Sequence, residues 1–265
     1  MKRVRKDTKR RKRTVFSGQG KPGIVFQADD GSLGLWKMNS GTLISANLFN
    51  PGNVGDLGWR VVGVDDFNND KKPDILFQHK DGTLAVWHMV GLDLKEAVLL
   101  TPNNPLPGWR VVGTGDFNGD GNPDIVLQHT DGTIGVWLMD GTTLKKAQLF
   151  NPNNPGIGWK VAGVGDFNRD VKSDLLFQHT DGSLAVWLMD GITLSSSQQL
   201  EPNDPGAGWS VKGIIDLAGD GNSDLLFQHT DGSVAVWFMD GTRLKSSQLL
   251  SPSNPGKGWE LVGPK

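Results

Sequence analysis

Residues 115–124 read G-D-F-N-G-D-G-N-P-D and separate two apolar runs. Oxygen-bearing side chains fall at alternate positions, Asp116, Asn118 and Asp120, and a further carboxylate follows at Asp124. That spacing gathers oxygen ligands around one point, as a hard divalent cation such as calcium requires. The same stretch returns every 50 residues, so the rest of the chain can be laid out around it.

Two ladders of tryptophan indicate that the chain consists of five copies of one unit. In the first ladder each tryptophan follows a glycine, at intervals of 50 residues: Trp59, Trp109, Trp159, Trp209 and Trp259. The second ladder has one interval of 51 and comprises Trp36, Trp87, Trp137, Trp187 and Trp237. The extra residue falls in the connector 51–58, and a surface loop tolerates such an insertion.

The unit that begins at Trp109 is predicted to form four short strands. They cover residues 109–113, 124–128, 133–137 and 144–150. The Asp-Gly pairs between apolar runs are strong hairpin signals, because glycine takes the positive φ of a tight turn. No helical periodicity of useful length occurs. The chain is therefore predicted to be all-β.

Four-stranded antiparallel units repeated at this period predict a five-bladed β-propeller. Residues 258–263 form a first strand with no second strand after it, whereas the chain from residue 14 supplies a second strand with no first. We therefore expect the C-terminal strand to join the N-terminal blade and close the ring. The predicted propeller covers 14–265, with blades at 258–263 plus 14–50, 59–100, 109–150, 159–200 and 209–250.

Charge is distributed unevenly. Residues 1–13 hold nine Lys or Arg and one Asp, whereas the remaining 252 residues carry 18 basic and 28 acidic groups, a balance of −10. A block of like charge cannot bury a core, so residues 1–13 are predicted to be a disordered arm. It is a candidate for binding nucleic acid, an anionic surface or an import receptor, or else a solvated tail without a partner.

The composition also bears on location and chemistry. No apolar core follows the basic run, so no secretory signal is visible, and no run approaches the roughly 20 apolar residues of a membrane span. Without cysteine there is no disulfide, thiolate metal site or thiol nucleophile. Tyrosine, the nucleophile of sialidase chemistry, is also absent. Because each candidate carboxylate recurs in the repeats, while catalysis needs one asymmetric site, we expect a non-enzyme.

The unit G-W-x-V-V-G-x-G-D-F-N-x-D-G-x-x-D resembles the FG-GAP / VCBS repeat of integrin-type propellers and many bacterial surface and secreted proteins. The resemblance covers residues 14–265. It implies a calcium ion in the loop between the first two strands of a blade, a surface or secreted location, and binding of carbohydrates or proteins rather than catalysis. Integrin-type propellers usually have seven blades, so five depart from the common pattern.

Calcium loops of this type take side-chain ligands at positions 1, 3, 5 and 9, and position 6 favours glycine at a sharp turn. The predicted metal ligands are Asp66, Asn68, Asp70 and Asp74; Asp116, Asn118, Asp120 and Asp124; Asp166, Asn168, Asp170 and Asp174; and Asp216, Asp220 and Asp224. Position 6 holds Gly121 and Gly221 but also Lys71 and Val171, and valine is a poor residue for positive φ. Blade one has lost the site, with Val15, Ser17, Gln19 and Gly23 at the ligand positions.

Asp and Asn also make turns without any metal. Three acidic groups on one short loop repel each other unless a cation is present, which favours up to four structural Ca²⁺ sites. The loop at 116–124 is the most complete of them.

The opposite face of the predicted disc carries tryptophan, histidine and aspartate in blades two to five, whereas blade one has Ala28 in place of the histidine and retains Asp30. The candidate ligand-binding residues are Trp59, His79 and Asp81; Trp109, His129 and Asp131; Trp159, His179 and Asp181; Trp209, His229 and Asp231; and Trp259. Indoles beside Asp and His suit a sugar, whose C–H face stacks on the ring while its hydroxyls form hydrogen bonds. The alternative is that the tryptophans pack blade against blade and the histidines stabilise turns.

Near-uniform surface sites around a ring favour a multivalent, lectin-like carbohydrate binder, because repetition gains avidity. A protein-interaction or adhesion scaffold would instead predict one specialised patch. An engineered or recently amplified repeat with no selected ligand is a third possibility. We expect a monomer whose partners are glycans or a cell-surface protein.

Overall fold

The computed structural model describes residues 16 and 21–264, and throughout this part the regular elements are strands. The basic arm at residues 1–13 lies outside the described residues, as do Val15, Ser17 and Gln19 of the lost loop. No helix in the described part is long and apolar enough to cross a membrane. The chain is all-β, as its sequence predicts.

Within these residues, twenty strands fall into five groups of four, which we number as repeats one to five. Repeat one comprises β20 (Trp259–Gly263), β1 (Gly23–Ala28), β2 (Ser32–Asn39) and β3 (Thr42–Asn53). Repeat two comprises β4 (Trp59–Asp65), β5 (Asp74–His79), β6 (Leu84–Val90) and β7 (Asp93–Leu99). Repeat three comprises β8 (Trp109–Gly115), β9 (Asp124–His129), β10 (Ile134–Asp140) and β11 (Thr143–Leu149). Repeat four comprises β12 (Trp159–Gly165), β13 (Asp174–His179), β14 (Leu184–Asp190) and β15 (Thr193–Gln199). Repeat five comprises β16 (Trp209–Ile215), β17 (Asp224–His229), β18 (Val234–Asp240) and β19 (Arg243–Leu249).

Repeats three, four and five are separate four-stranded sheets, whereas repeats one and two form one eight-stranded sheet in the order β20-β1-β2-β3-β7-β6-β5-β4. The pair Asn50↔Asp93, between the outer strands β3 and β7, joins the two halves. The same parallel step links the other neighbouring repeats as isolated bridges: Thr101↔Thr143, Asn151↔Thr193, Glu201↔Arg243 and Thr42↔Ser251. The eight-stranded sheet is therefore two antiparallel four-stranded sheets fastened at their rims.

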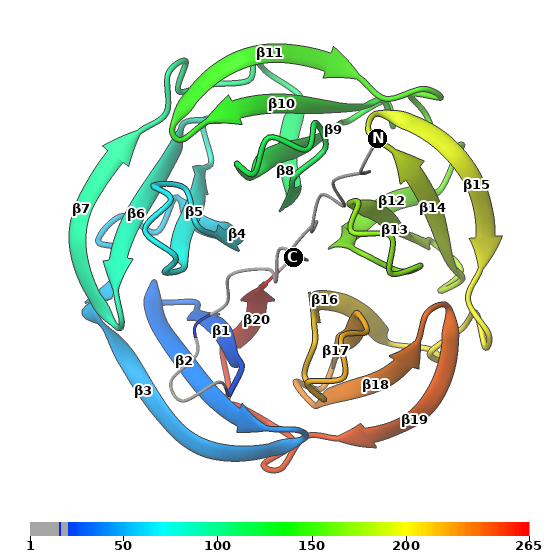
Figure 1. Ribbon diagram of the computed structural model, residues 1–265. Coiled ribbons are helices and arrows are strands. Elements are labelled where there is room, and N and C mark those ends of the chain that lie inside the picture. Colours follow the sequence, from blue (N-terminus) through cyan, green and yellow to red (C-terminus); the bar gives the residue numbers. More distant parts are fainter. Residues whose placement is uncertain (1–15, 17–20, 265) are drawn as a thin grey trace, which may run out of the picture.

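Figure 1 shows the sheets set around a common centre, with the first strand of each repeat innermost and the fourth outermost. The innermost strands contact one another in the cyclic order β4, β8, β12, β16, β20 and back to β4. The C-terminal strand β20 pairs antiparallel with β1, with Ala28 opposite Trp259. Two segments from opposite ends of the chain thus complete repeat one.

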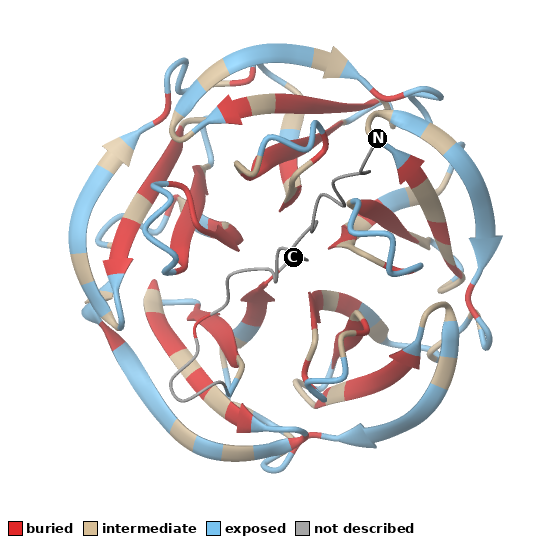
Figure 2. Ribbon diagram, viewed as in Figure 1, coloured by how far each residue is buried: buried red, intermediate tan, exposed pale blue. Residues whose placement is uncertain are grey.

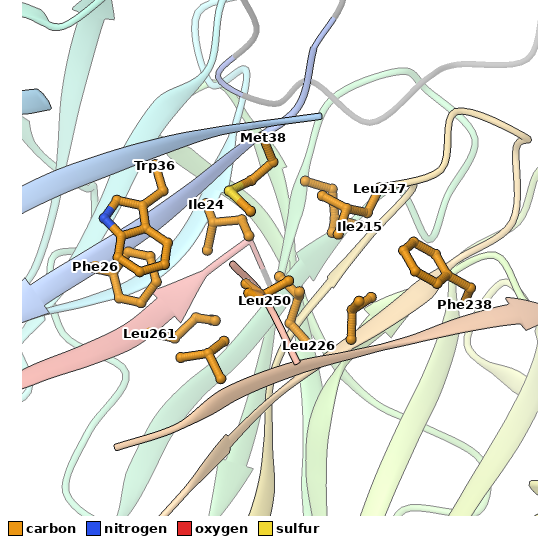
Figure 3. Packing of buried hydrophobic residues seen from close by; sticks show 12 residues of the cluster. Ile24, Phe26, Trp36, Met38, Ile215, Leu217, Leu226, Phe238, Leu250 and Leu261 are labelled. Carbon is orange, nitrogen blue, oxygen red and sulfur yellow. The ribbon is translucent and has the colours of Figure 1, made fainter. Parts of the chain in front are cut away.

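The core lies between neighbouring sheets. Figure 2 shows buried residues on the inner strands, whereas the outermost strands are largely exposed. One cluster joins repeats five and one and is drawn in Figure 3, where Phe26 and Trp36 approach Leu261 and Leu226. The tryptophans of the second ladder pack in the core. The ring centroid of Trp36 lies 4.8 Å from that of Phe26, and the same tryptophan–phenylalanine contact recurs in repeats two, four and five.

A glutamine, buried in four of the five repeats, also ties each repeat to the next. Gln78 at the end of β5 donates from Nε2 to the carbonyl of Trp109 (3.2 Å) and accepts at Oε1 from the amide of Val111 (3.0 Å). The equivalent clamps are made by Gln27, Gln128, Gln178 and Gln228, the last of which holds β20. Sequence reasoning missed these residues, although glutamine precedes the His turn in every repeat, including the divergent first one, where Ala28 replaces the histidine.

Candidate functional site

The acidic loops lie between the first and second strands of repeats two to five, on what we call the loop face. Each is folded by its own side chains. In repeat three, Asp116 accepts hydrogen bonds at Oδ1 from the amide of Gly119 (2.7 Å) and at Oδ2 from that of Gly121 (2.9 Å). Asn118 accepts from the amide of Asp120 (2.8 Å) in the same manner. The predicted ligands thus also shape the loop, as Asx turns do.

Two positions of every acidic loop are left-handed. Position 6 has φ values of 67° at Lys71, 90° at Gly121, 74° at Val171 and 85° at Gly221. The sequence-based expectation of a sharp turn there is confirmed, and Val171 adopts it despite its branched side chain. Position 4 is left-handed as well, at Asn69, Gly119, Arg169 and Gly219. In the sequence, only Gly119 and Gly219 indicated this second bend.

The carboxylate at position 9 has a structural role that the spacing did not reveal. Asp124 is fully buried; its Oδ2 accepts from the amide of Phe117 (2.8 Å) and its Oδ1 from that of Met139 on β10 (2.9 Å). It thereby joins the loop to the third strand. The same bonds are made by Asp74, Asp174 and Asp224. Burial raises the pKa of Asp124 to about 7, because the charged form loses its hydration.

Repeat two differs from the others at this carboxylate. His88, on β6, lies with its Nδ1 3.0 Å from Oδ2 of Asp74, and both side chains are buried. Leucine or phenylalanine stands at the corresponding place in repeats three to five. Burial raises the pKa of Asp74, and the hydrogen bond to His88 opposes that rise.

The donor set suits calcium, because it consists of hard carboxylate and amide oxygens on a loop bent at position 6. In repeat five, Oδ1 of Asp216 is buried and has no hydrogen-bond partner among the described residues. A buried carboxylate oxygen without a partner fits the role of a cation ligand. Within residues 16 and 21–264, however, no three His, Cys, Asp or Glu side chains converge closely enough to hold a metal ion. The calcium sites therefore remain a prediction. The predicted loss of the site in blade one concerns residues that lie mainly outside the described part.

The opposite surface, which we call the His face, carries the turns 79–82, 129–132, 179–182 and 229–232 together with the connectors that precede each Gly-Trp pair. Connector and turn are joined in repeat two, where Asn104 donates from Nδ2 to the carbonyl of Asp81 (3.0 Å). The structure brings the predicted tryptophan, histidine and aspartate of each of repeats two to five together here. In repeat three the ring centroids of Trp109 and His129 are 5.2 Å apart, and Nδ1 of His129 lies 2.9 Å from Oδ1 of Asp131.

The same group recurs in repeats two, four and five, with ring distances of 5.0 Å. Glycine before each tryptophan is needed for close approach: a Cβ added at Gly108 would lie 2.3 Å from Nε2 of His129. Hydrogen bonds from the Thr133 amide and from His129 lower the pKa of Asp131 to about 2. Repeat one lacks the imidazole, because Ala28 stands opposite Trp259.

The described residues also line two cavities. A central cavity of about 860 Å³ opens on the loop face and is lined by Asp65, Thr114, Val164 and Ile214 among others. A second, of about 510 Å³, lies on the His face between repeat five and β20.

Comparison with solved structures gives matches of low identity. Raptor of Chaetomium thermophilum is 13% identical with a TM-score of 0.46, over 90% of this chain and 20% of that one. The computationally designed protein Ika8 is 17% identical with a TM-score of 0.35, over 91% and 63%. The Malassezia sympodialis allergen Mala s 1 is 12% identical with a TM-score of 0.45, over 87% and 77%. The chain thus spans a fifth of Raptor and under two thirds of Ika8, and likenesses this weak carry no functional argument.

No curated protein sequence matches the chain. The model of the FG-GAP-like repeat matches twice, over residues 66–127 and 116–177. Each match begins at position 1 of an acidic loop and ends within the second strand of the following repeat. Residues 66–177, which include acidic loops and four-stranded sheets of the repeating kind, thus match the FG-GAP-like repeat, as their sequence motif implied.

Proposed function

We propose that this chain is a five-bladed, calcium-stabilised propeller that binds carbohydrates through its His face. The observation that carries the binding proposal is the recurrence of one Trp-His-Asp group at four equivalent surface positions. The FG-GAP repeats support a non-catalytic binding module.

Three cyclic features support the five-bladed ring. The innermost strands contact one another in a closed order, the outer rims are linked by five equivalent backbone bridges, and a glutamine clamp occurs at each of the five seams. Each feature treats the seam between repeats five and one like the other four. A closed ring sets the inner edge strands against one another around the axis, so that these edges are short and protected from pairing with another chain.

Calcium is the proposed ligand of the four acidic loops. Each loop carries three carboxylates within nine residues, and an ion that binds only the folded state stabilises it by mass action. We expect addition of a chelator to lower the melting temperature of the calcium-loaded protein, and Asp116→Asn to weaken calcium binding measured by calorimetry. Equal melting temperatures in calcium and in chelator would contradict the assignment.

The carbohydrate proposal rests on the chemistry of the repeated group. An indole offers a stacking surface, and an ionised Asp beside an imidazole offers both an acceptor and a donor to hydroxyls. Weak sites repeated around one face gain affinity for a surface that displays many copies of a glycan. We expect binding on a glycan array at millimolar calcium, and stronger binding to densely than to sparsely printed spots.

A protein-interaction scaffold is the second candidate, and one observation favours it. The connectors of repeats two, three and four project aliphatic side chains from the His face: Leu57, Leu106 and Ile157 are 56%, 70% and 100% exposed. Ala207 and Lys257 take the place of Leu57 and Ile157 near Trp209 and Trp259, while Leu106 lies one residue earlier in its connector. Silence across the glycan array, together with a protein captured by the wild type but not by Ile157→Asp, would establish this function instead.

A further inference from the structure

The five Gly-Trp strands are not equivalent at the seam between repeats five and one. In repeats two to five an imidazole lies against the indole, whereas the residue paired with Trp259 is Ala28. A methyl group covers far less of an indole than an imidazole does. The residue after Ala28 also differs, because Asp29 stands where repeats three to five have threonine.

A groove of about 510 Å³ adjoins this tryptophan, and its volume lies within the roughly 300–1,000 Å³ of small-molecule sites. Trp259, Asp29 and Lys257 line it from the repeat-one side and the connector, and His229, Asp231 and Asn254 from the turn of repeat five and the connector after it. Its walls thus combine one aromatic surface with several polar groups of both signs.

The charges of the groove favour a neutral ligand. Lys212 and Glu260 form an ion pair of 2.6 Å across the seam, and Nδ1 of His229 lies 3.0 Å from Oδ1 of Asp231. Asp29 and Lys257 have opposite signs. A strongly charged ligand would be repelled by either Asp29 or Lys257. The hydroxyl groups of a neutral ligand can donate to Asp29 and accept from Lys257.

We propose that this groove is the principal monosaccharide site of the protein, and that it takes a neutral pyranose. The C–H face of the sugar stacks on Trp259, and vicinal hydroxyls hydrogen-bond to Asp29, Asn254 and Lys257. This inference rests on the carbohydrate-binding function proposed above and deepens it. The four tryptophans beside histidines then contribute mainly through avidity.

The sharpest test gives repeat one the residues found in repeat five. The double variant Ala28→His, Asp29→Thr recreates the sequence His229-Thr230, an arrangement the fold already accepts, so it should fold normally and cover Trp259. Titration with neutral monosaccharides (glucose, galactose, mannose, fucose and N-acetylglucosamine), followed by tryptophan fluorescence and calorimetry, should show one sugar bound by the wild type. Affinity for that sugar should fall about ten-fold or more in the double variant.

Two control variants and two contrary outcomes sharpen the test. Lys146→Ala, on the exposed outer strand β11, should leave monosaccharide affinity unchanged, and Asp29→Asn alone should weaken it less than the double variant does. Unchanged monosaccharide affinity in the double variant would overturn the groove but leave the carbohydrate function standing. Absence of binding by the wild type, both to free sugars and on the array, would remove both proposals.

Discussion

The most strained residue of the acidic loops is Val171. It has a φ of 74°, a conformation that Gly121 and Gly221 adopt freely at the same position of their loops. Its side chain is 46% exposed, so little packing compensates for the strain. The sequence predicted this conflict, because valine interrupts a pattern in which the turn needs positive φ.

Val171→Gly should therefore stabilise the protein. Relief of a left-handed β-branched residue is worth about 1 kcal/mol, which corresponds to a rise in melting temperature of about 2–4 °C in a chain of this size. Val171→Ala keeps a Cβ and should recover only part of the gain. A lower melting temperature for Val171→Gly than for the wild type would show that the side chain packs better than its exposure indicates.

The aspartates of the His-face turns make the free energy of unfolding depend on pH. The pKa of Asp81, Asp131, Asp181 and Asp231 is lowered to about 2, first by backbone hydrogen bonds from the residue two positions ahead. A carboxylate whose pKa falls on folding stabilises the native state above its unfolded value near 4, and that contribution disappears as pH falls toward 2. Chemical denaturation at pH 6, 4 and 2.5 should show wild type losing more stability than Asp131→Asn, whose amide does not titrate. Parallel losses would mean that the turn does not distinguish the two side chains.

At the level of strands, the clamping glutamines connect neighbouring repeats, a role that the local sequence motif does not indicate. The sequence predicted the four strands of each unit and the hairpin turns, because alternation and Asp-Gly pairs are local signals. It did not predict the clamps, since the partners of Gln78 lie more than 30 residues away in the next repeat. The inward-facing role of Asp124 was missed for a related reason: spacing identifies oxygen atoms but not the direction in which they point.

Gln78→Met should be destabilising although it preserves volume. It leaves the amide of Val111 and the carbonyl of Trp109 buried without their partner, at a cost of about 2 kcal/mol or more. Gln198→Met, on the exposed outer strand β15, is the matched control and should change stability by less than about 0.5 kcal/mol. Urea denaturation of both variants measures the difference; equal stabilities would show that water replaces the clamp.

For the whole molecule, the decisive contact is that between β20 and β1. The sequence alone predicted this pairing, because the fragment at each end of the chain lacks the strand that the other supplies. The sequence also indicated that repeat one lacks the histidine, because Ala28 stands in its place, and the pairing sets Ala28 opposite Trp259.

Removal of residues 257–265 should open the molecule. It deletes β20, which removes Leu261 from the cluster drawn in Figure 3 together with Trp259, which packs against that cluster, and it leaves the inner edge of β1 unpaired. A fall of about 10 °C or more in melting temperature is expected. A synthetic peptide of residues 257–264 added to the truncated protein should restore most of the loss, and failure of both effects would show that the ring does not depend on this strand.

The pairing of the first sheet with the last strand also constrains the order of events during synthesis. On the ribosome, β1 emerges early, yet the strand that covers it is the last of the described strands to be made. The six residues of β1, all buried in the finished protein, remain unpaired on that side while repeats two to five are translated. A nascent chain of this design therefore exposes an apolar strand edge throughout the translation of repeats two to five, and its yield in cells should depend on chaperones that bind the chain before β20 appears.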